Sequence, residues 1–482
     1  WDVGFEATGR ITGLKLMLAA NCGFSADLSG PVADRAVFHA DNAYFLEDVE
    51  IVSYRCRTNV QSHTAFRGFG GPQGMIVTEA ILGDIARHLG LDALNVRQRN
   101  FYGTTERNVT HYGMTVEDNI IAPLVARLAA DARYAERRAD IARWNATQPV
   151  LRRGIAITPV KFGISFTATF FNQAGALVNV YTDGSVQVNH GGTEMGQGLH
   201  TKVCQIVADE LGLPFERVRI TASHTGKVPN ASATAASSGT DLNGRAAQFA
   251  AREVRARLAA HVAKQQGCEP GAIVFQAGLV RGPGGTQTWE QVVDDAYHAR
   301  VQLWSDGFYA TPKIHYDKYT LSGRPFFYFA YGAACTEVAI DTLTGESRVL
   351  KVDILHDAGR SINPAIDIGQ IEGGFIQGMG WLTTEQLVWT DKGQLATHAP
   401  STYKIPATGD LPAHFHVALW PEANREDNVA GSKAVGEPPF MLALSVFEAM
   451  RDAVAAARGG PVRLDAPATA ENVLKALQGP SA

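Results

Sequence analysis

Cysteine is scarce and scattered in this sequence. The 482 residues include five cysteines, and no two of them form a Cys-x-x-Cys pair. This spacing argues against a disulfide framework and against an iron–sulfur or structural zinc site on the chain. The histidines form no His-Glu-x-x-His pair, so no metal-ligating side chains are predicted. A reducing, cytoplasmic setting fits this cysteine usage best.

The sequence also lacks long apolar runs and a strong charge of either sign. No apolar stretch is long enough to span a bilayer, and the net charge is only −5. Neither a membrane segment nor a nucleic-acid patch is therefore expected. The first residues, "WDVGFEATGR", contain no methionine and no signal-peptide pattern, and they read as part of a strand. We expect the chain to be a piece of a longer protein.

The patterning that is present predicts an α+β protein. Alternating apolar runs on both sides of Asp183-Gly184 and of Thr344-Gly345 indicate β-hairpins. Between such strand pairs lie apolar stretches with helical spacing. Strands and hairpins therefore alternate with helices along the chain.

The length predicts two or three domains, since 482 residues make about three typical domains. The most polar and helical-looking stretch is 103–150, which suggests a helical linker. We therefore expect a first domain over 1–102 and a second over 151–482.

A glycine-rich turn before a helix occurs five times. The turns lie in "AFRGFGGPQG", "HGGTEMGQG", "SATAASSGTDLNG", "AIDIGQIEGG" and "AVGEPP". Each helix start offers unpaired backbone N–H groups and a positive dipole end. If the five starts converge, they would cradle one elongated anionic ligand through backbone contacts. None of the turns matches a Walker A loop or a Rossmann fingerprint. Separate turns that serve only packing are the alternative.

One carboxylate has an unusual position, in "SKAVGEPPF". Glu437 lies between Gly436 and two prolines, and proline pushes the residue before it into an extended conformation. A strongly apolar helix is predicted to follow over residues 440–457. The carboxylate is thus held on a stiff segment at the mouth of a buried helix. It is either a capping or salt-bridge acid or a general base.

Longer motifs occur in order along the whole chain. They are "TAFRGFGGPQ", "KFGISF", "GGTEMGQGLHTK", "TAASSGTD", "NPAIDIGQIEG", "STYKIPA" and "SKAVGEPP". Together they closely resemble the molybdenum-cofactor half of the xanthine dehydrogenase family. The resemblance implies large mixed α/β molybdopterin-binding domains. It also implies a molybdopterin with molybdenum in the sulfido form, held through the pterin dithiolene. The implied reactions oxidise hypoxanthine to xanthine and xanthine to urate.

The resemblance also implies catalytic roles. In the family, the glutamate of the "GEPP" motif is the general base, and it corresponds to Glu437. This base takes a proton from the molybdenum-bound hydroxyl, which attacks the purine while hydride passes to the sulfido ligand. The family's arginine that offsets charge on the purine lies in a motif like "DRAVFHADNAY" and corresponds to Arg35. Without the resemblance, Arg35 would be interpreted as a surface ion-pair residue.

Binding residues follow from the same motifs. Phe69 and Phe166 correspond to the phenylalanines that hold the purine, and Thr167 corresponds to a residue that hydrogen-bonds the substrate. From the residues alone, both phenylalanines would be assigned to the core. The implied cofactor-binding residues are Phe66, Arg67, Gly196, Gln197, Thr234, Ala235, Ala236, Ser237 and Gln370.

Rival activities can be ranked by the same motifs. Aldehyde oxidases share the cofactor and the base but generally carry a non-basic residue in place of the substrate arginine, so Arg35 favours xanthine dehydrogenase. Carbon monoxide dehydrogenases carry a cysteine in the loop occupied here by "AFRGFGG", which contains none. A non-catalytic module that holds a ligand with glycine loops is the alternative from a different class.

Partners are implied as well. The five scattered cysteines cannot hold the paired iron–sulfur clusters of the family, and no flavin-binding segment is visible. Iron–sulfur clusters and FAD are therefore expected on a partner chain or on a missing segment. The upstream part of the molybdenum domain should carry a second substrate-binding glutamate and another cofactor glutamine. The whole assembly is expected to be a dimer, and residues 1–482 alone should bind little molybdopterin.

Overall fold

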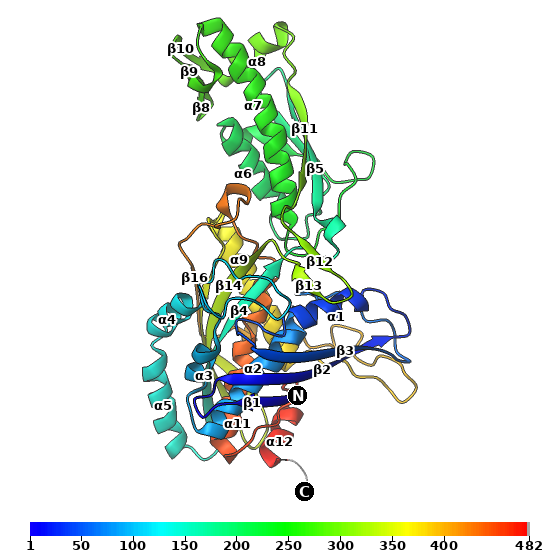
Figure 1. Ribbon diagram of the computed structural model, residues 1–482, viewed down its shortest axis with the longest axis vertical. Coiled ribbons are helices and arrows are strands. Elements are labelled where there is room, and N and C mark those ends of the chain that lie inside the picture. Colours follow the sequence, from blue (N-terminus) through cyan, green and yellow to red (C-terminus); the bar gives the residue numbers. More distant parts are fainter. Residues whose placement is uncertain (480–482) are drawn as a thin grey trace.

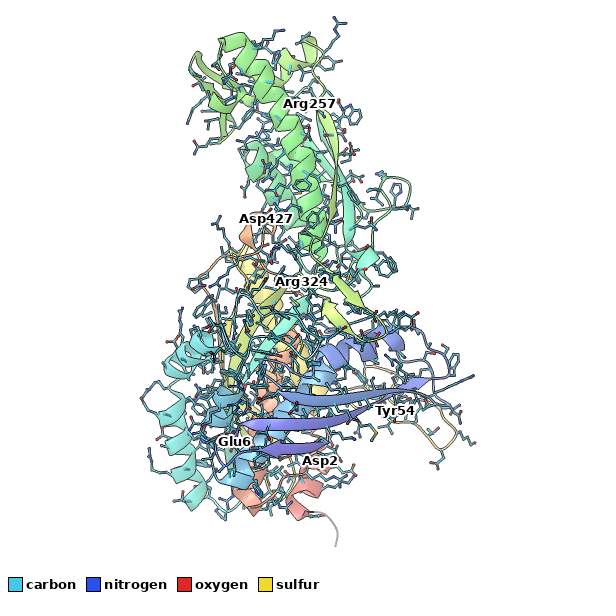
Figure 2. The ribbon with its side chains drawn as sticks, viewed as in Figure 1. Asp2, Glu6, Tyr54, Arg257, Arg324 and Asp427 are labelled. Carbon is cyan, nitrogen blue, oxygen red and sulfur yellow. The ribbon has the colours of Figure 1, made fainter. Side chains whose placement is uncertain are left out.

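The molecule is elongated, with a broad lower body and a narrower upper lobe (Figure 1). The computed structural model describes residues 1–479. The upper lobe consists of residues 173–310, and both termini belong to the lower body. With side chains drawn, Asp2 and Glu6 mark the lower body and Arg257 marks the upper lobe (Figure 2). None of the helices within residues 1–479 combines the length and apolar character needed to cross a bilayer.

Two sheets build the lower body. One has the order β1-β2-β3, with β1 antiparallel and β3 parallel to β2. Its strands are β1 (Asp2–Phe5), β2 (Ile11–Gly23) and β3 (Asp48–Arg57). The other has the order β16-β15-β14-β4, antiparallel except for the pair β15 and β16. Its strands are β4 (Leu151–Ile164), β14 (Tyr328–Asp341), β15 (Ser347–His356) and β16 (His414–Leu419).

Helices surround these sheets, and α11 packs directly on β4 and β14. The helices of the lower body are α1 (Ser29–Phe38), α2 (Gly71–Leu89), α3 (Ala93–Asn100), α4 (Ile121–Asp131), α5 (Tyr134–Thr147), α9 (Pro364–Thr383), α10 (Pro438–Met441), α11 (Leu444–Arg458) and α12 (Ala470–Gln478). The helix expected after Glu437 is therefore split into α10 and α11. Its predicted apolar side is buried, since Phe440, Leu444 and Val454 are each at most 1% exposed.

The upper lobe is a four-stranded sheet covered by helices. The sheet has the order β11-β5-β6-β7, and α7 packs along β11 and β5. Its strands are β5 (Gln173–Val180), β6 (Val186–His190), β7 (Val218–Ile220) and β11 (Trp304–Ala310). Its helices are α6 (Leu199–Leu211), α7 (Arg245–Gln266) and α8 (Trp289–His298). Small strands complete the fold: β8 (Val274–Gln276), β9 (Leu279–Gly282), β10 (Gly285–Thr288), β12 (His315–Asp317) and β13 (Ser322–Arg324).

The hairpins expected from the turn residues are confirmed. Strands β5 and β6 pair antiparallel around Asp183-Gly184, and β14 and β15 pair antiparallel around Thr344-Gly345. Both glycines have positive φ, 78° and 76°, which the tight turns require.

The segment 103–150 holds two helices and packs into the core. Leu124 and Val125 of α4 are fully buried, and Ile141 of α5 is 4% exposed. They share one hydrophobic cluster with residues of the first sheet and of β14. The helical content agrees with the expectation for this segment. Its role as a linker between 1–102 and 151–482 stays a prediction.

The backbone at the start of α2 lies in close contact with the backbone of α1. A Cβ on Gly70, which has φ 105°, would lie 2.0 Å from the carbonyl oxygen of Val32. A Cβ on Gly74 would lie 2.2 Å from the carbonyl oxygen of Ala36. Glycine is thus required at both positions. This contact places the helix that carries Arg35 against the loop that precedes α2.

A buried ion cluster ties this fold to the segment before Glu437. Lys433 donates through Nζ to Asp357 at 2.7 Å, to Asp118 at 2.9 Å and to the Phe329 carbonyl at 3.0 Å. Burial by itself lowers the pKa of Lys433, but the attraction of Asp357 and Asp118 is larger, so the pKa is raised. The ammonium therefore stays charged, and it joins three distant parts of the chain.

We expect Asp118→Asn to lower the free energy of unfolding by about 2 kcal/mol, because it leaves part of a buried charge without its counter-charge. A denaturant titration measures the change. Glu471→Gln is the matched control, since Glu471 pairs with Lys475 on the surface, where both side chains are more than half exposed. The control should change stability by less than about 0.5 kcal/mol. Equal effects of the two substitutions would contradict a stabilising role of the cluster.

Candidate active site

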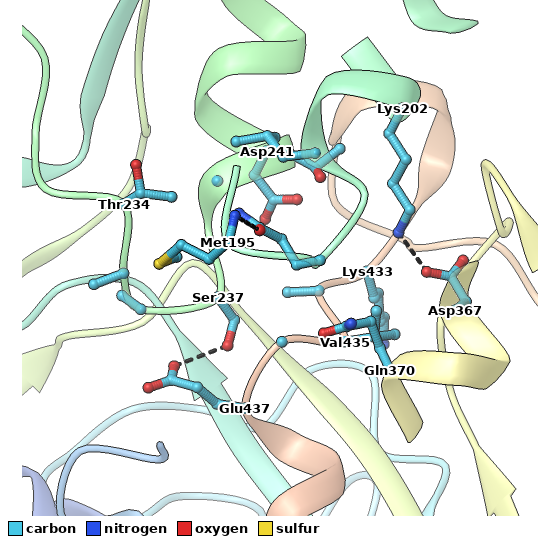
Figure 3. A pocket seen from close by; sticks show the side chains of 18 of the residues that line it. Met195, Lys202, Thr234, Ser237, Asp241, Asp367, Gln370, Lys433, Val435 and Glu437 are labelled. Carbon is cyan, nitrogen blue, oxygen red and sulfur yellow. Dashed lines mark hydrogen bonds and ion pairs between the residues drawn. The ribbon is translucent and has the colours of Figure 1, made fainter. Parts of the chain in front are cut away.

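All five glycine-rich stretches singled out in the sequence border one cavity, but only four of them open a helix, because "AIDIGQIEGG" lies inside α9, which begins at Pro364. The cavity has a volume of about 470 Å³ and lies where the upper lobe meets the lower body. Its walls come from the loop before α2, the turn before α6, the loop before α7, helix α9 and the segment before α10. The convergence that the glycine turns suggested is therefore observed. Figure 3 shows side chains of this cavity.

Most of the predicted cofactor residues line this cavity. They are Arg67, Gln197, Thr234, Ala235, Ala236, Ser237 and Gln370, together with the predicted base Glu437. Gly196 belongs to the same turn as Gln197 but does not line the cavity. Phe66 lines a neighbouring, more open cavity of about 730 Å³. The two cavities share Gln377.

The carboxylate of Glu437 is held by two donors from other parts of the chain. The Gly68 backbone N–H donates to Oε1 at 3.1 Å, and the Ser237 hydroxyl donates to Oε2 at 2.8 Å (Figure 3). The backbone of Glu437 is helical, with φ −114° and ψ −40°, and not extended as the following proline predicted. Glu437 is the N-cap residue of α10, and the two donors hold its carboxylate at the cavity wall.

Removing one donor should weaken the placement of this carboxylate. We expect Ser237→Ala to lower kcat about tenfold, which corresponds to one lost hydrogen bond to a charged group. KM should change little, because Ser237 contacts Glu437 and no predicted substrate residue. Ser238→Ala is the control, since that hydroxyl bonds only the Ala235 carbonyl. A decrease of the same size in both variants would contradict the assigned role of Ser237.

Arg67 links the cavity wall to the segment that carries Glu437. Its Nε donates to the Gly436 carbonyl at 2.6 Å, and its Nη1 donates to the Gln377 side chain at 3.1 Å. Its Nη2 lies 3.4 Å from the Gln370 carbonyl. Burial lowers the pKa of Arg67, and the nearby charge of Glu437 opposes that shift. The guanidinium thus positions the backbone next to the carboxylate.

Charged side chains that the sequence analysis missed also line the cavity. Lys202 pairs with Asp367, and both side chains are less than a tenth exposed (Figure 3). Asp241 accepts from Tyr328 and Asn428, and burial raises its pKa. A signal was present for Lys202, because it is a lysine in the first turn of the helix that follows the glycine-rich turn in "GGTEMGQGLHTK".

The start of α6 is already satisfied by the protein's own carboxylate. Glu194 accepts the backbone N–H groups of Gly196 at 2.9 Å, Gly198 at 3.0 Å and His200 at 3.0 Å. The side chain of Gln197 bonds the backbone of Met195 and Thr193. The backbone N–H groups at this helix start are therefore not free, contrary to what the glycine turn had led us to expect. The side chain of Glu194, two residues before Gly196, accepts their hydrogen bonds.

Three non-glycine residues at the site have left-handed backbone. Phe69 has φ 50°, Ala236 has φ 54° and Ser237 has φ 57°. This conformation is unfavourable for residues with a side chain and is concentrated at functional sites. At Ser237 it accompanies the hydroxyl contact with Glu437, and at Phe69 it lies between Gly68 and Gly70 in the loop that lines the cavity.

Arg35 is buried and not on the surface, with 1% of its area exposed. Its Nη1 donates to the Ser165 carbonyl at 2.9 Å, and its Nη2 donates to the Gly163 carbonyl. Burial lowers the pKa of Arg35, and the charge of Glu437 opposes that shift. Arg35 does not line the cavity described above. It is joined to the end of β4, directly before Phe166 and Thr167.

The remaining predicted substrate residues lie near Arg35 in the fold. Phe166 and Thr167 begin a short loop that Asn172 closes, since its side chain bonds both backbone groups of Phe166. Phe69 belongs to the loop whose last residue, Gly70, contacts α1. None of the three lines the cavity of Glu437. Their roles in binding a substrate stay predictions.

Comparison with known proteins identifies the family. The model of the molybdopterin cofactor-binding domain matches residues 127–412, and a second model of the same description matches residues 1–101. The chain belongs to this family. It is 45% identical over 484 residues to xanthine dehydrogenase/oxidase of Mus musculus, over 99% of this chain and 35% of that protein. It is 44% identical over 481 residues to xanthine dehydrogenase/oxidase of Gallus gallus, over 99% of this chain and 34% of that protein.

A solved structure has the same fold. Quinoline 2-oxidoreductase from Pseudomonas putida 86 matches with a TM-score of 0.86 and 25% identity, over 99% of this chain and 61% of that chain. The predicted fold class and the resemblance to the molybdenum-cofactor part of xanthine dehydrogenases are confirmed. The chain spans about a third of the length of the curated relatives described above.

The cavity fits an anionic pterin cofactor. Arg67 supplies positive charge, whereas Lys202 is paired with Asp367, and the starts of α7, α9 and α10 border the cavity. Gln197, Gln370 and Gln377 supply amide groups for the polar edge of a pterin. Within residues 1–479 no group of three or more His, Cys, Asp or Glu side chains could hold a metal ion.

Proposed function

We propose that this chain is the molybdenum-cofactor part of an enzyme that oxidises hypoxanthine to xanthine and xanthine to urate. One observation carries the proposal. The carboxylate of Glu437, held by the Gly68 N–H and the Ser237 hydroxyl, borders a cavity suited to molybdopterin. Its negative charge also opposes the lowering of the Arg35 pKa by burial. A general base and a cation on opposite sides of a bound purine are what base-assisted hydroxylation requires.

Glu437 acts as the proton acceptor. The bound cofactor supplies an oxygen donor and accepts two electrons from the substrate. The carboxylate of Glu437 takes up the proton that is released, and its two donors keep one orientation before and after the transfer. Holding the base in place removes the cost of orienting it during the reaction. The Gly436 carbonyl bound to Arg67 keeps the adjacent backbone in place.

Arg35 stabilises negative charge on the purine. Its guanidinium is held by two carbonyls of β4 and has donors left for a substrate. In a buried site such a cation acts more strongly than in water. Phe69 and Phe166 would hold the flat ring, Thr167 would hydrogen-bond it, and Phe66 and Gly196 would contact the cofactor at the edge of its cavity.

Electron transfer requires a partner. Electrons from each turnover must leave the site, and the five cysteines are all unpaired and lie far apart in the chain. Iron–sulfur clusters and FAD would be supplied by another part of the assembly, together with the upstream part of the molybdenum domain. The complete assembly would be a cytoplasmic dimer.

The test uses the complete protein that contains this chain. Molybdenum content is measured together with turnover of xanthine, hypoxanthine and a small aldehyde. We expect stoichiometric molybdenum and turnover of both purines. Turnover of the aldehyde without the purines would replace the proposal with an aldehyde oxidase activity. A protein that binds a ligand without molybdenum and without turnover would be a non-catalytic module.

A further inference from the structure

His39 is a buried histidine at the end of α1, one turn beyond Arg35, with 1% of its area exposed. Its Nε2 lies 3.0 Å from the backbone nitrogen of Gly163, and its Nδ1 lies 3.1 Å from the carbonyl oxygen of Arg35. A backbone N–H can only donate and a carbonyl can only accept. Nε2 therefore carries the lone pair and Nδ1 carries the proton. The ring is neutral and in one tautomer.

These contacts form a closed ring of hydrogen bonds. The Arg35 guanidinium donates to the Gly163 carbonyl, the Gly163 N–H donates to His39, and His39 donates to the Arg35 carbonyl. Both backbone groups of Gly163 are thus bound to α1. A Cβ at this position would lie 2.2 Å from the Phe326 ring, so glycine is required there. The ring couples the end of β4 to both the backbone and the side chain of Arg35.

Two aromatic rings enclose the same pair of side chains. The Arg35 Cζ atom lies 4.5 Å from the centroid of Phe162 and 5.2 Å from that of Phe326. The His39 ring lies 4.7 Å and 5.0 Å from the same two centroids. Burial and the positive charges of Arg35 and Lys161 hold the pKa of His39 well below its ordinary value. A charged imidazole would both lack the acceptor for Gly163 and repel Arg35.

We propose that His39 is a positioning residue that sets the orientation of Arg35 and thereby the preference for purine substrates. The proposal rests on the proposed function, because it takes Arg35 as the cation that faces the purine. His39 itself touches no reacting atom. Without its acceptor, the Gly163 N–H would be buried and unpaired, and the backbone at residues 163–165 would move to satisfy it. Both carbonyls that hold the guanidinium belong to that segment.

The experiment compares three substitutions in the complete enzyme. His39→Phe keeps an aromatic ring and removes both nitrogens. His39→Gln places an amide oxygen near Nε2 and restores an acceptor for Gly163. His111→Phe is the control, because His111 is largely buried and bonds another α1 carbonyl, that of Val37 at 2.9 Å, without contacting Gly163. The readouts are kcat/KM for xanthine and for a small aldehyde, per molybdenum, and hydrogen–deuterium exchange of the Gly163 amide.

We expect His39→Phe to lower the xanthine-to-aldehyde ratio of kcat/KM at least tenfold and to speed exchange at Gly163. His39→Gln should recover most of both effects, and His111→Phe should leave the ratio within twofold of wild type. A His39→Phe ratio within twofold of wild type would overturn the proposal. If that variant does not fold, His39→Gln is compared with His39→Asn, which cannot reach Gly163, and equal ratios would overturn it. Absence of xanthine turnover in the wild type would instead reject the proposed function, and Gly163 exchange would still decide the hydrogen-bond ring.

Discussion

Replacing Glu437 with glutamine should lower xanthine turnover by roughly 10²–10⁴-fold, the contribution of a positioned general base. Glutamine has nearly the same size as glutamate; its amide oxygen can accept from the Gly68 N–H and its NH2 group can donate to the Ser237 hydroxyl oxygen, but it cannot take up a proton. The loss should therefore appear in kcat, with KM nearly unchanged. Steady-state kinetics of the complete enzyme measure both constants.

Molybdenum content separates lost chemistry from lost cofactor in this experiment. It should stay near the wild-type value in Glu437→Gln, because the substitution removes neither positive charge nor a helix start from the cavity. Glu385→Gln is the matched control, since Glu385 borders the neighbouring cavity and bonds Tyr403. The control should keep turnover within a few fold of wild type. Glu437→Gln enzyme that retains a tenth of wild-type turnover would refute the assignment of the base.

Replacing Arg35 with methionine should reduce kcat/KM for xanthine roughly 100-fold. This corresponds to a loss of about 3 kcal/mol of transition-state stabilisation. The charge that Arg35 offsets develops on the purine ring during the reaction, so kcat should fall as well. Small aldehydes do not develop this ring charge and should lose much less. The measurement is the ratio of kcat/KM for xanthine and for a simple aldehyde, in wild type and variant.

Arg245→Met provides a control of the same kind. Arg245 is a buried arginine that bonds the Asp427 carbonyl and lies 5.8 Å from the Phe249 ring centroid, much as Arg35 bonds carbonyls and lies over Phe162. It faces no predicted substrate residue, so its loss should affect xanthine and aldehyde alike. Equal losses for both substrates in Arg35→Met would eliminate the specific role of Arg35.

Local features of this protein follow from its sequence for physical reasons. Gly184 adopts the positive φ that the hairpin turn after Asp183 needs, and the strands around it pair as expected. Glycine-rich turns precede α2, α6 and α7, and Glu437 with two prolines precedes α10, whereas "AIDIGQIEGG" lies inside α9, which already begins at Pro364. Such features depend on a few neighbouring residues, so residue type and spacing suffice to predict them.

The conformation of Glu437 shows where local rules stop. Proline after this residue favours an extended backbone, whereas the structure has ψ −40°. The Gly68 N–H and the Ser237 hydroxyl come from segments about 369 and 200 residues away. Long-range contacts therefore outweigh the preference of a single residue pair. At the start of α6 the deviation has a local cause, because Glu194 of the same turn occupies the N–H groups that the glycine turn suggested were free.

The sequence by itself determined the residue types of the site, the turns that open its helices and, through its ordered motifs, the family. Only the tertiary structure decided which groups meet. Arg35 looks like a surface residue in the sequence, yet it is buried against the Gly163 and Ser165 carbonyls. Lys433 is joined to Asp118 and Asp357 in the same way. The reason is that a charge can be buried only where distant segments bring its partners within hydrogen-bond distance, and no local pattern encodes that distance.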